Sequence, residues 1–225
     1  MCAVRALPKP ELPVADSNAA ASPGVAAIAV LPCPTAPTQH LAVNLMRTDP
    51  GWSTMTHHHG ALDTTLYVLQ GTMAFHCGPG LEKSVAVQAG ELASIDPHAV
   101  HAEYNPSAIL ANLGITARDT PGNFIVPCDK PSSAAEGATG IVIVPPLATR
   151  HASPGIDASD ALKPLGPQHL RVGRLALDRL TIAPGMTFEP ETATCGETAI
   201  CVIGGTARII DTGSDKSMTG TSGAW

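Results

Sequence analysis

The residues that could do chemistry lie in the segment from Gly51 to Asn105. His57 and His59 are two residues apart, so on a β-strand both side chains leave the same face. Asp63 follows four residues later, and His101 comes after a second strand pattern and a proline-marked turn. Two imidazoles from one strand, a nearby carboxylate and an imidazole from a distant strand suit a divalent transition metal. The first hypothesis is therefore a metal site.

The framework around these residues resembles the cupin family. The first cupin motif is a glycine, five residues, His-x-His, an acid that is usually Glu, and a closing glycine; this chain matches it with Gly51, His57, His59, Asp63 and Gly71. The second motif is matched by Gly90, Pro97, His101 and Asn105, with His98 where a turn glycine is usual. The resemblance implies a small β-barrel whose metal ligands would be His57, His59, Asp63 and His101.

Aspartate in place of glutamate leaves the role of Asp63 open. The side chain is one methylene shorter, which reduces its reach by about 1.5 Å, whereas metal–ligand distances are held within about 0.2 Å. Asp63 could bind directly or through water, or the site could be a three-histidine centre. In another register Thr64 takes the acid position, and Asp63 is a neighbour only.

Composition and charge exclude several functional classes. Only 3% of the 225 residues are aromatic, while 44% are hydrophobic, and 21 glycines and 21 prolines predict many turns between short strands. A net charge of −6 without a Lys/Arg cluster argues against nucleic-acid binding. No apolar run approaches the ~20 residues that span a bilayer, so a membrane is not an expected partner. Six scattered cysteines and the lack of a secretory signal predict reduced thiols and a cytoplasmic location.

The elements that must position the site are short strands. Strand patterns cover residues 24–31, 40–47, 66–69, 72–77, 84–88, 92–95, 108–117 and 140–144, and resume at residue 170. We expect the Leu66–Leu69 and Thr72–Cys77 runs to form a hairpin about Gly71. Short strands with regularly spaced turns are typical of an all-β sandwich or barrel. Together with the resemblance, this predicts a cupin-type double-stranded β-helix, or jelly-roll barrel.

An internal repeat appears at an offset of 134 residues. Pro50/Pro184, Gly51/Gly185, Thr64/Thr198, Val68/Val202, Gly71/Gly205 and Thr72/Thr206 are identical pairs. In the second copy, however, His57, His59 and Asp63 are replaced by Glu191, Ala193 and Glu197, and no histidine follows His169. The repeat predicts a two-barrel plan, a bicupin with a degenerate and incomplete second unit.

The predicted organisation has four parts. Residues 1–23 form a disordered or surface arm, 24–126 the cupin domain with the metal site, 127–168 a linker, and 169–225 the partial cupin-like unit. An incomplete barrel leaves strand edges that a second copy could cover, so a homo-oligomer is a further expectation.

The functional hypothesis is a metal-dependent enzyme acting on a small oxygen-bearing molecule. The resemblance implies dioxygenase, decarboxylase, isomerase or hydrolase chemistry with Fe, Mn, Zn or Ni, and ligand type does not choose among these metals. Asp63 is the candidate ligand or base, and Tyr67 and His76 are further catalytic candidates. The alternative is a non-catalytic small-molecule binding, sensor or storage module with a structural metal. Asn105 is expected to cap a turn rather than to touch a ligand.

Overall fold

The computed structural model describes residues 24–122, 125–129, 140–144, 168–172, 174–187, 196–211 and 216–222. The predicted N-terminal arm, most of the predicted linker, and Glu191 and Ala193 of the second repeat lie outside these residues. The fold is all-β, as expected, and the one short helical element in the described part is the 3-10 turn η1 (Pro79–Leu81). None of the helices found in that part is long and apolar enough to span a membrane.

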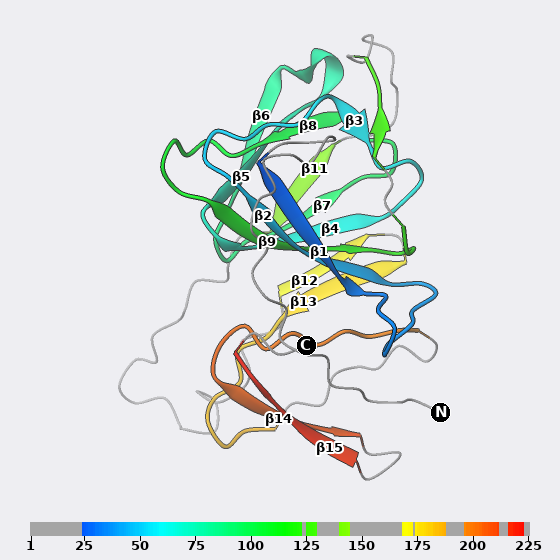
Figure 1. Ribbon diagram of the computed structural model, residues 1–225, viewed down its shortest axis with the longest axis vertical. Helices are drawn as coiled ribbons and strands as arrows, with labels where there is room; N and C mark the ends of the chain where they lie inside the picture. The colour runs from blue at the N-terminus through cyan, green and yellow to red at the C-terminus, as the bar shows by residue number, and fades with distance from the viewer. Residues whose placement is uncertain are drawn as a thin grey trace.

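Two antiparallel sheets form the main body (Figure 1). The six-stranded sheet has the order β1 (Val25–Leu31), β2 (Ala42–Thr48), β9 (Asn112–Arg118), β4 (Thr64–Gln70), β7 (Leu92–Ile95) and β11 (Ile141–Val144). The five-stranded sheet has the order β10 (Val126–Pro127), β3 (His57–His58), β8 (His101–Tyr104), β5 (Thr72–Cys77) and β6 (Lys83–Gln88). This arrangement of two antiparallel sheets confirms the expected double-stranded β-helix, or jelly-roll, fold.

Most strand expectations are confirmed, two of them to the residue at β5 and β7. The predicted strand over residues 108–117 begins only at Asn112, because Asn105 organises the preceding loop. Its amide Nδ2 donates to the carbonyls of Thr48, Asp49 and Leu110, and its Oδ1 accepts from the Ser107 N–H. The expectation that Asn105 caps a turn is therefore confirmed.

The predicted hairpin between β4 and β5 is wrong. Strand β4 pairs with β7 on one side and with β9 on the other, so it has no free edge for β5, which pairs with β6 and β8 in the other sheet. The chain changes sheet at Gly71, whose φ is 80°. A Cβ at this position would collide with the side chain of Asn112, which hydrogen-bonds both backbone groups of Thr72. Glycine is therefore required here by conformation and by space.

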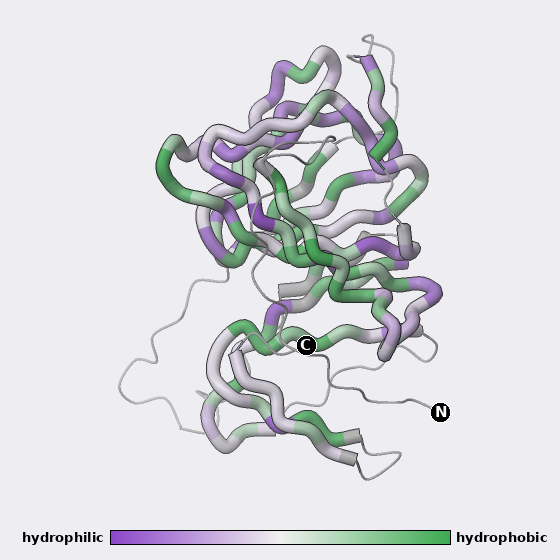
Figure 2. The backbone as a smooth tube through the Cα atoms, viewed as in Figure 1, coloured by the Kyte–Doolittle hydropathy of each residue, from purple (hydrophilic) through white to green (hydrophobic). Residues whose placement is uncertain are grey.

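Alternation along β4 and β9 separates two hydrophobic clusters. Leu66 and Val68 point between the two sheets, where they pack with Met73 and Phe75 of the five-stranded sheet. Tyr67 and Ile115 point to the opposite face of the six-stranded sheet. We call these two directions the inner and the outer face. Strand β1, which is apolar along its length (Figure 2), contributes Val30 and Leu31 to the outer cluster.

The second repeat does not form a closed sheet in the described residues. It contributes two separate two-stranded sheets, β12 (Gln168–Val172) with β13 (Leu175–Arg179), and β14 (Thr206–Asp211) with β15 (Lys216–Thr221). Leu170 and Leu175 of the first pair belong to the outer cluster, so this hairpin covers the outer face of the six-stranded sheet (Figure 1). Strand β11, from within the predicted linker, pairs with β7 and adds to the first unit instead. The predicted domain boundaries otherwise stay a prediction.

Candidate metal centre

Three of the predicted ligands come together on the inner face of the five-stranded sheet. His57 lies on β3 and His101 on β8, and the two residues are directly paired across these strands. The ring centroids of His57 and His101 are 4.5 Å apart, those of His57 and His59 5.1 Å, and those of His59 and His101 5.0 Å. All three side chains are buried. His58, between the first two, turns away and accepts a hydrogen bond from the Gly60 N–H at Nδ1.

The carboxylate in this group belongs to Glu103, which the sequence analysis did not select. Ligand atoms of His57, His59, His101 and Glu103 all lie within 4.8 Å of one another. The Glu103 Oε1 is 3.6 Å from the His101 Nε2. The signal was present in the sequence, because Glu103 is two residues after His101 and therefore shares its strand face, as His59 shares that of His57.

The histidines are oriented by backbone carbonyls. His57 donates its Nδ1–H to the Met55 carbonyl at 2.9 Å, and His101 donates its Nδ1–H to the Ala99 carbonyl at 2.8 Å. In the neutral imidazole this leaves Nε2 as an unprotonated acceptor, which is the form that ligates metals. The Nε2 of His101 is buried and has no hydrogen-bond partner among the described residues. An orphaned acceptor facing two imidazoles and a carboxylate fits a divalent transition metal.

The electrostatics of the cluster also favour the metal-binding forms. Burial lowers the pKa of His57, so its imidazole stays neutral at pH values where an exposed histidine is already protonated. The charge of Glu103 opposes this shift of the pKa. Burial alone would raise the pKa of Glu103, but the contact with His101 and the positive charges that the three histidines carry when protonated outweigh it and hold that pKa at about 2. Glu103 is therefore an anion, as a ligand must be.

Asp63 is not brought into this group. It stands just before β4, two residues from Thr65 and four from Tyr67, whose side chain packs in the outer cluster. Its Oδ2 accepts a hydrogen bond of 2.9 Å from the Arg174 N–H, and the Arg174 side chain donates to Asp119 at 2.6 Å. Thr64, the alternative candidate for the acid position, is fully buried and begins the strand whose next alternate residue, Leu66, faces inward. The geometry thus favours the register with Thr64 inside and Asp63 outside.

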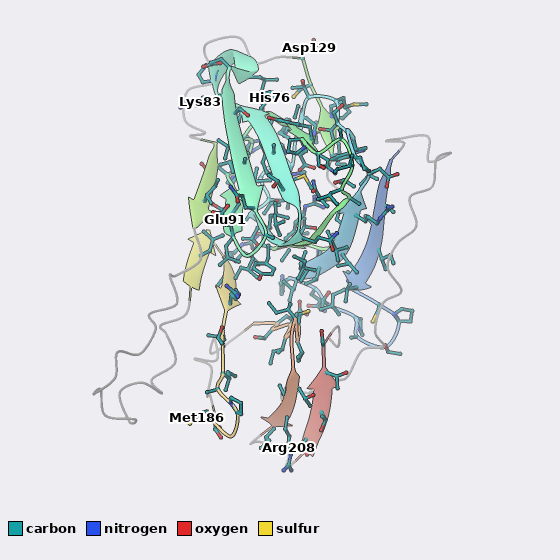
Figure 3. All side chains as sticks on the ribbon, turned by 90° about the vertical axis from the view of Figure 1, so that its left-hand side faces the viewer. His76, Lys83, Glu91, Asp129, Met186 and Arg208 are labelled. Atoms are coloured by element: carbon teal, nitrogen blue, oxygen red, sulfur yellow. The ribbon has the colours of Figure 1, made fainter. Side chains whose placement is uncertain are left out.

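The other two catalytic candidates also lie away from the histidines. Tyr67 belongs to the outer cluster, with the Arg179 guanidinium 6.0 Å from its ring centroid. His76 is exposed on the outside of β5, near Lys83 of the neighbouring strand β6 (Figure 3), and stacks on Tyr104 at 4.6 Å between centroids. The catalytic roles predicted for Asp63, Tyr67 and His76 therefore gain no support from this geometry and stay predictions.

One further charged side chain points into the interior. Arg118 ends β9, shares the strand face of Gly114 and Thr116, and is 9% exposed. A Cβ on Gly114 would touch the inward-facing Leu66 at 3.1 Å, which identifies this face as the inner one. Burial lowers the pKa of Arg118 and the charge of Glu103 opposes the shift, while Arg118 itself helps to lower the pKa of His57. The guanidinium and the cluster thus share one interior.

The structure resembles several solved structures at low identity. An uncharacterized conserved protein with a double-stranded β-helix domain from Klebsiella pneumoniae is 24% identical over 40% of this chain and 76% of its own, with a TM-score of 0.34. Oxalate oxidase in complex with the substrate analogue glycolate is 16% identical over 49% of this chain and 57% of its own, with a TM-score of 0.38. KdgF from Halomonas sp. is 19% identical over 44% and 82%, with a TM-score of 0.36. At such scores these neighbours carry no argument about ligand or activity.

A comparison with family models is more specific, although no curated protein matches the sequence significantly. The model described as the cupin domain matches residues 44–111. This range contains β3, β4, β5 and β8, and with them every residue of the cluster. The resemblance noted in the two sequence motifs is thereby supported: residues 44–111 match the cupin domain, and the match carries His57, His59, His101 and Glu103.

Proposed function

We propose that the chain is a metal-dependent cupin enzyme whose divalent transition metal is held by His57, His59, His101 and Glu103. The single observation that carries this proposal is the buried cluster itself, with four potential ligand atoms within 4.8 Å of one another. Buried imidazoles and a largely buried carboxylate are costly unless they are paired or bind a cation. All four groups could ligate one bound cation at the same time.

The substrate class follows from the net charge of the proposed metal centre and from its open coordination positions. Three neutral imidazoles and one carboxylate leave a divalent ion with about one positive charge, and four protein ligands leave open positions on a six-coordinate ion. Such a site favours a small molecule with an oxygen donor. When bound, the metal would supply Lewis-acid or redox chemistry according to its identity. Dioxygenase, decarboxylase, isomerase and hydrolase reactions are all compatible with this donor set.

The surrounding residues have separate tasks in this proposal. The carbonyls of Met55 and Ala99 fix the tautomers of His57 and His101, and Phe75 packs against His101 with 5.9 Å between ring centroids. These contacts hold the imidazoles in one orientation and keep bulk water from their apolar side. The cytoplasmic location and the homo-oligomer expected from the sequence stay predictions.

The decisive experiment measures metal content by plasma mass spectrometry on untagged protein. We expect near-stoichiometric Fe, Mn, Ni or Zn in the wild type and none in the H57A/H59A/H101A variant. The control is H58A, because His58 lies within the same triplet but turns away, and it should keep the metal. No metal in the wild type after reconstitution, or equal metal in the triple variant, would overturn the proposal.

We also propose that the second repeat is a partial cupin unit of the same ancestry. Gly51 and Gly185 have φ values of 70° and 77°, and Gly71 and Gly205 have 80° and 77°. The turn closed by the Trp52 N–H on the Asp49 carbonyl recurs with Met186 and Ala183, at 3.2 and 3.1 Å. Strand β14 begins and ends 134 residues after β5, and each forms a hairpin with the next strand. These matches in conformation support the repeat seen in the sequence.

A further inference from the structure

Within the described part of the chain, no close carboxylate balances the charge of Arg118. Among the residues that the structure describes, no Asp or Glu oxygen lies within 4.0 Å of its guanidinium, and its Nε has no hydrogen-bond partner. A cation that is about nine-tenths buried is normally paired, because desolvation is costly. Arg47, on the neighbouring strand β2, shows the ordinary arrangement: it is half-exposed and pairs with Asp49 at 2.7 Å.

The position of Arg118 is fixed by two strands. It pairs with Thr64 of β4 on one side and with Ala42 of β2 on the other, so the backbone cannot turn its side chain outward without breaking this register. Thr64 beside it is also buried, and its hydroxyl has no partner in the described part of the chain. A guanidinium and a hydroxyl thus stand on the inner face opposite the histidine cluster, both with unused hydrogen-bonding capacity.

Metal binding would increase the excess of positive charge around Arg118. The negative charge of Glu103 is the one that acts on Arg118, and the proposed metal would take up that charge. The interior would then hold an excess of positive charge from the ion and from the guanidinium. An anion with two or more oxygen atoms would compensate both, and a planar carboxylate matches the fork of a guanidinium.

We propose that Arg118 binds the carboxylate of a small anionic ligand, so that the site selects small carboxylic acids over neutral molecules of the same shape. This inference rests on the proposed function for its location and deepens it by naming the substrate class. Arg118 acts as a binding and specificity residue, and Thr64 provides a hydroxyl beside it. The side chain of Arg118 takes no part in holding the metal.

The test is calorimetric titration of the Mn(II)-loaded protein with glycolate and with its neutral isostere glycolamide. The wild type should bind glycolate more tightly than glycolamide. R118M should weaken glycolate binding roughly 10- to 100-fold, the range of a lost charge-assisted hydrogen bond, while glycolamide binding and Mn content stay unchanged. R118K, which keeps the charge but not the fork, should lie between. R47M is the matched control on the outside and should bind glycolate like the wild type.

The outcomes separate this inference from the proposed function. Equal glycolate affinity of the wild type and a folded, Mn-loaded R118M would overturn the inference and leave the metal site intact. If R118M does not fold, R118K decides: a loss for glycolate but not for glycolamide supports the role, and no loss refutes it. If the wild type takes up no metal, the proposed function fails, and the titration is done on the metal-free protein. Glycolate binding that R118M loses would then still support Arg118 as an anion site, and no binding would refute it.

Discussion

The two copies of the repeat differ at the histidines, since Glu191 and Ala193 replace His57 and His59, but both keep an acid at the position of Asp63 and Glu197. Each carboxylate binds backbone N–H groups of the other half of the chain: Asp63 accepts from Arg174 at 2.9 Å, and Glu197 accepts from Gln39 and His40 at 2.8 Å each. Residues 40 and 174 are themselves 134 apart, like Asp63 and Glu197. The contacts are therefore reciprocal, and in both copies this acid ties one half of the chain to the other.

This comparison explains why the acid of the sequence motif lies outside the histidine cluster. The histidines survive only in the first copy, and their carboxylate is supplied by Glu103 from β8 instead. Asp63 lies at the outer face, where the β12–β13 hairpin packs, so its environment is set by the second half of the chain. Asp63 matches a ligand position in the sequence motif, but in the structure its carboxylate hydrogen-bonds the second half of the chain.

The largest expected effect separates Glu103 from Asp63. E103Q should weaken metal binding by more than the roughly 10- to 100-fold typical of losing an outer-shell partner, because it removes the anionic ligand itself. D63N should leave metal affinity unchanged. Competition with a chromogenic chelator measures both constants. The reverse order, with D63N losing the metal and E103Q keeping it, would restore the sequence-based ligand set of His57, His59, Asp63 and His101.

The next prediction concerns the contribution of the reciprocal contacts to the stability of the protein. D63A should lower the free energy of unfolding by about 1–2 kcal/mol, since it leaves a partly buried N–H without its charged acceptor. E197A should cost less, under about 1 kcal/mol, because Glu197 and the residues it caps are exposed. Urea denaturation gives both values.

Limited proteolysis tests whether these contacts hold residues 168–222 against the first unit. Both variants should be cut faster within residues 168–222 than the wild type, while the first unit stays resistant. S84A is a control, because its hydrogen bond to Tyr104 lies within the five-stranded sheet. Unchanged stability and unchanged cleavage in D63A and E197A would show that the reciprocal contacts contribute nothing to docking.

The sequence was sufficient for the parts of the fold that depend on local pattern. Alternation and turn residues located β5 and β7 to the residue, and the spacing of His57, His59 and His101 identified three members of the cluster. His98, at the position of a turn glycine, adopts a φ of 59°. The bounds of β5 and β7, the shared direction of His57 and His59 and the turn at His98 are each decided by neighbours within a few residues, whereas the placing of His101 also used the second motif.

The remaining features depend on contacts between distant segments. Whether β4 pairs with β5 is decided by β7 and β9, which occupy both edges of β4. The hydrogen bonding of Asp63 depends on the backbone N–H of Arg174, which is 111 residues away in the sequence. Glu103 could have been found by applying to His101 the same strand alternation that selected His57 and His59. Arg118 could have been placed on the inner face in the same way, but only the three-dimensional structure shows that its Nε has no partner among the described residues.

The smallest expected effect is a pH dependence confined to the first copy. Burial lowers the pKa of His57 below 6.5. Just below that pH, the His57 imidazole therefore stays neutral in the folded protein but is protonated in the unfolded chain. The unfolding free energy of the metal-free protein should therefore fall as the pH drops below about 6.5. Glu103 adds a loss of the same sign between pH 4.5 and about 2. Chemical denaturation between pH 8 and 5 should show a smaller slope in H57Q than in the wild type, with the exposed His76→Gln as control. An equal slope in H57Q would mean that His57 does not provide this dependence, and that the metal-free cluster accepts protons elsewhere.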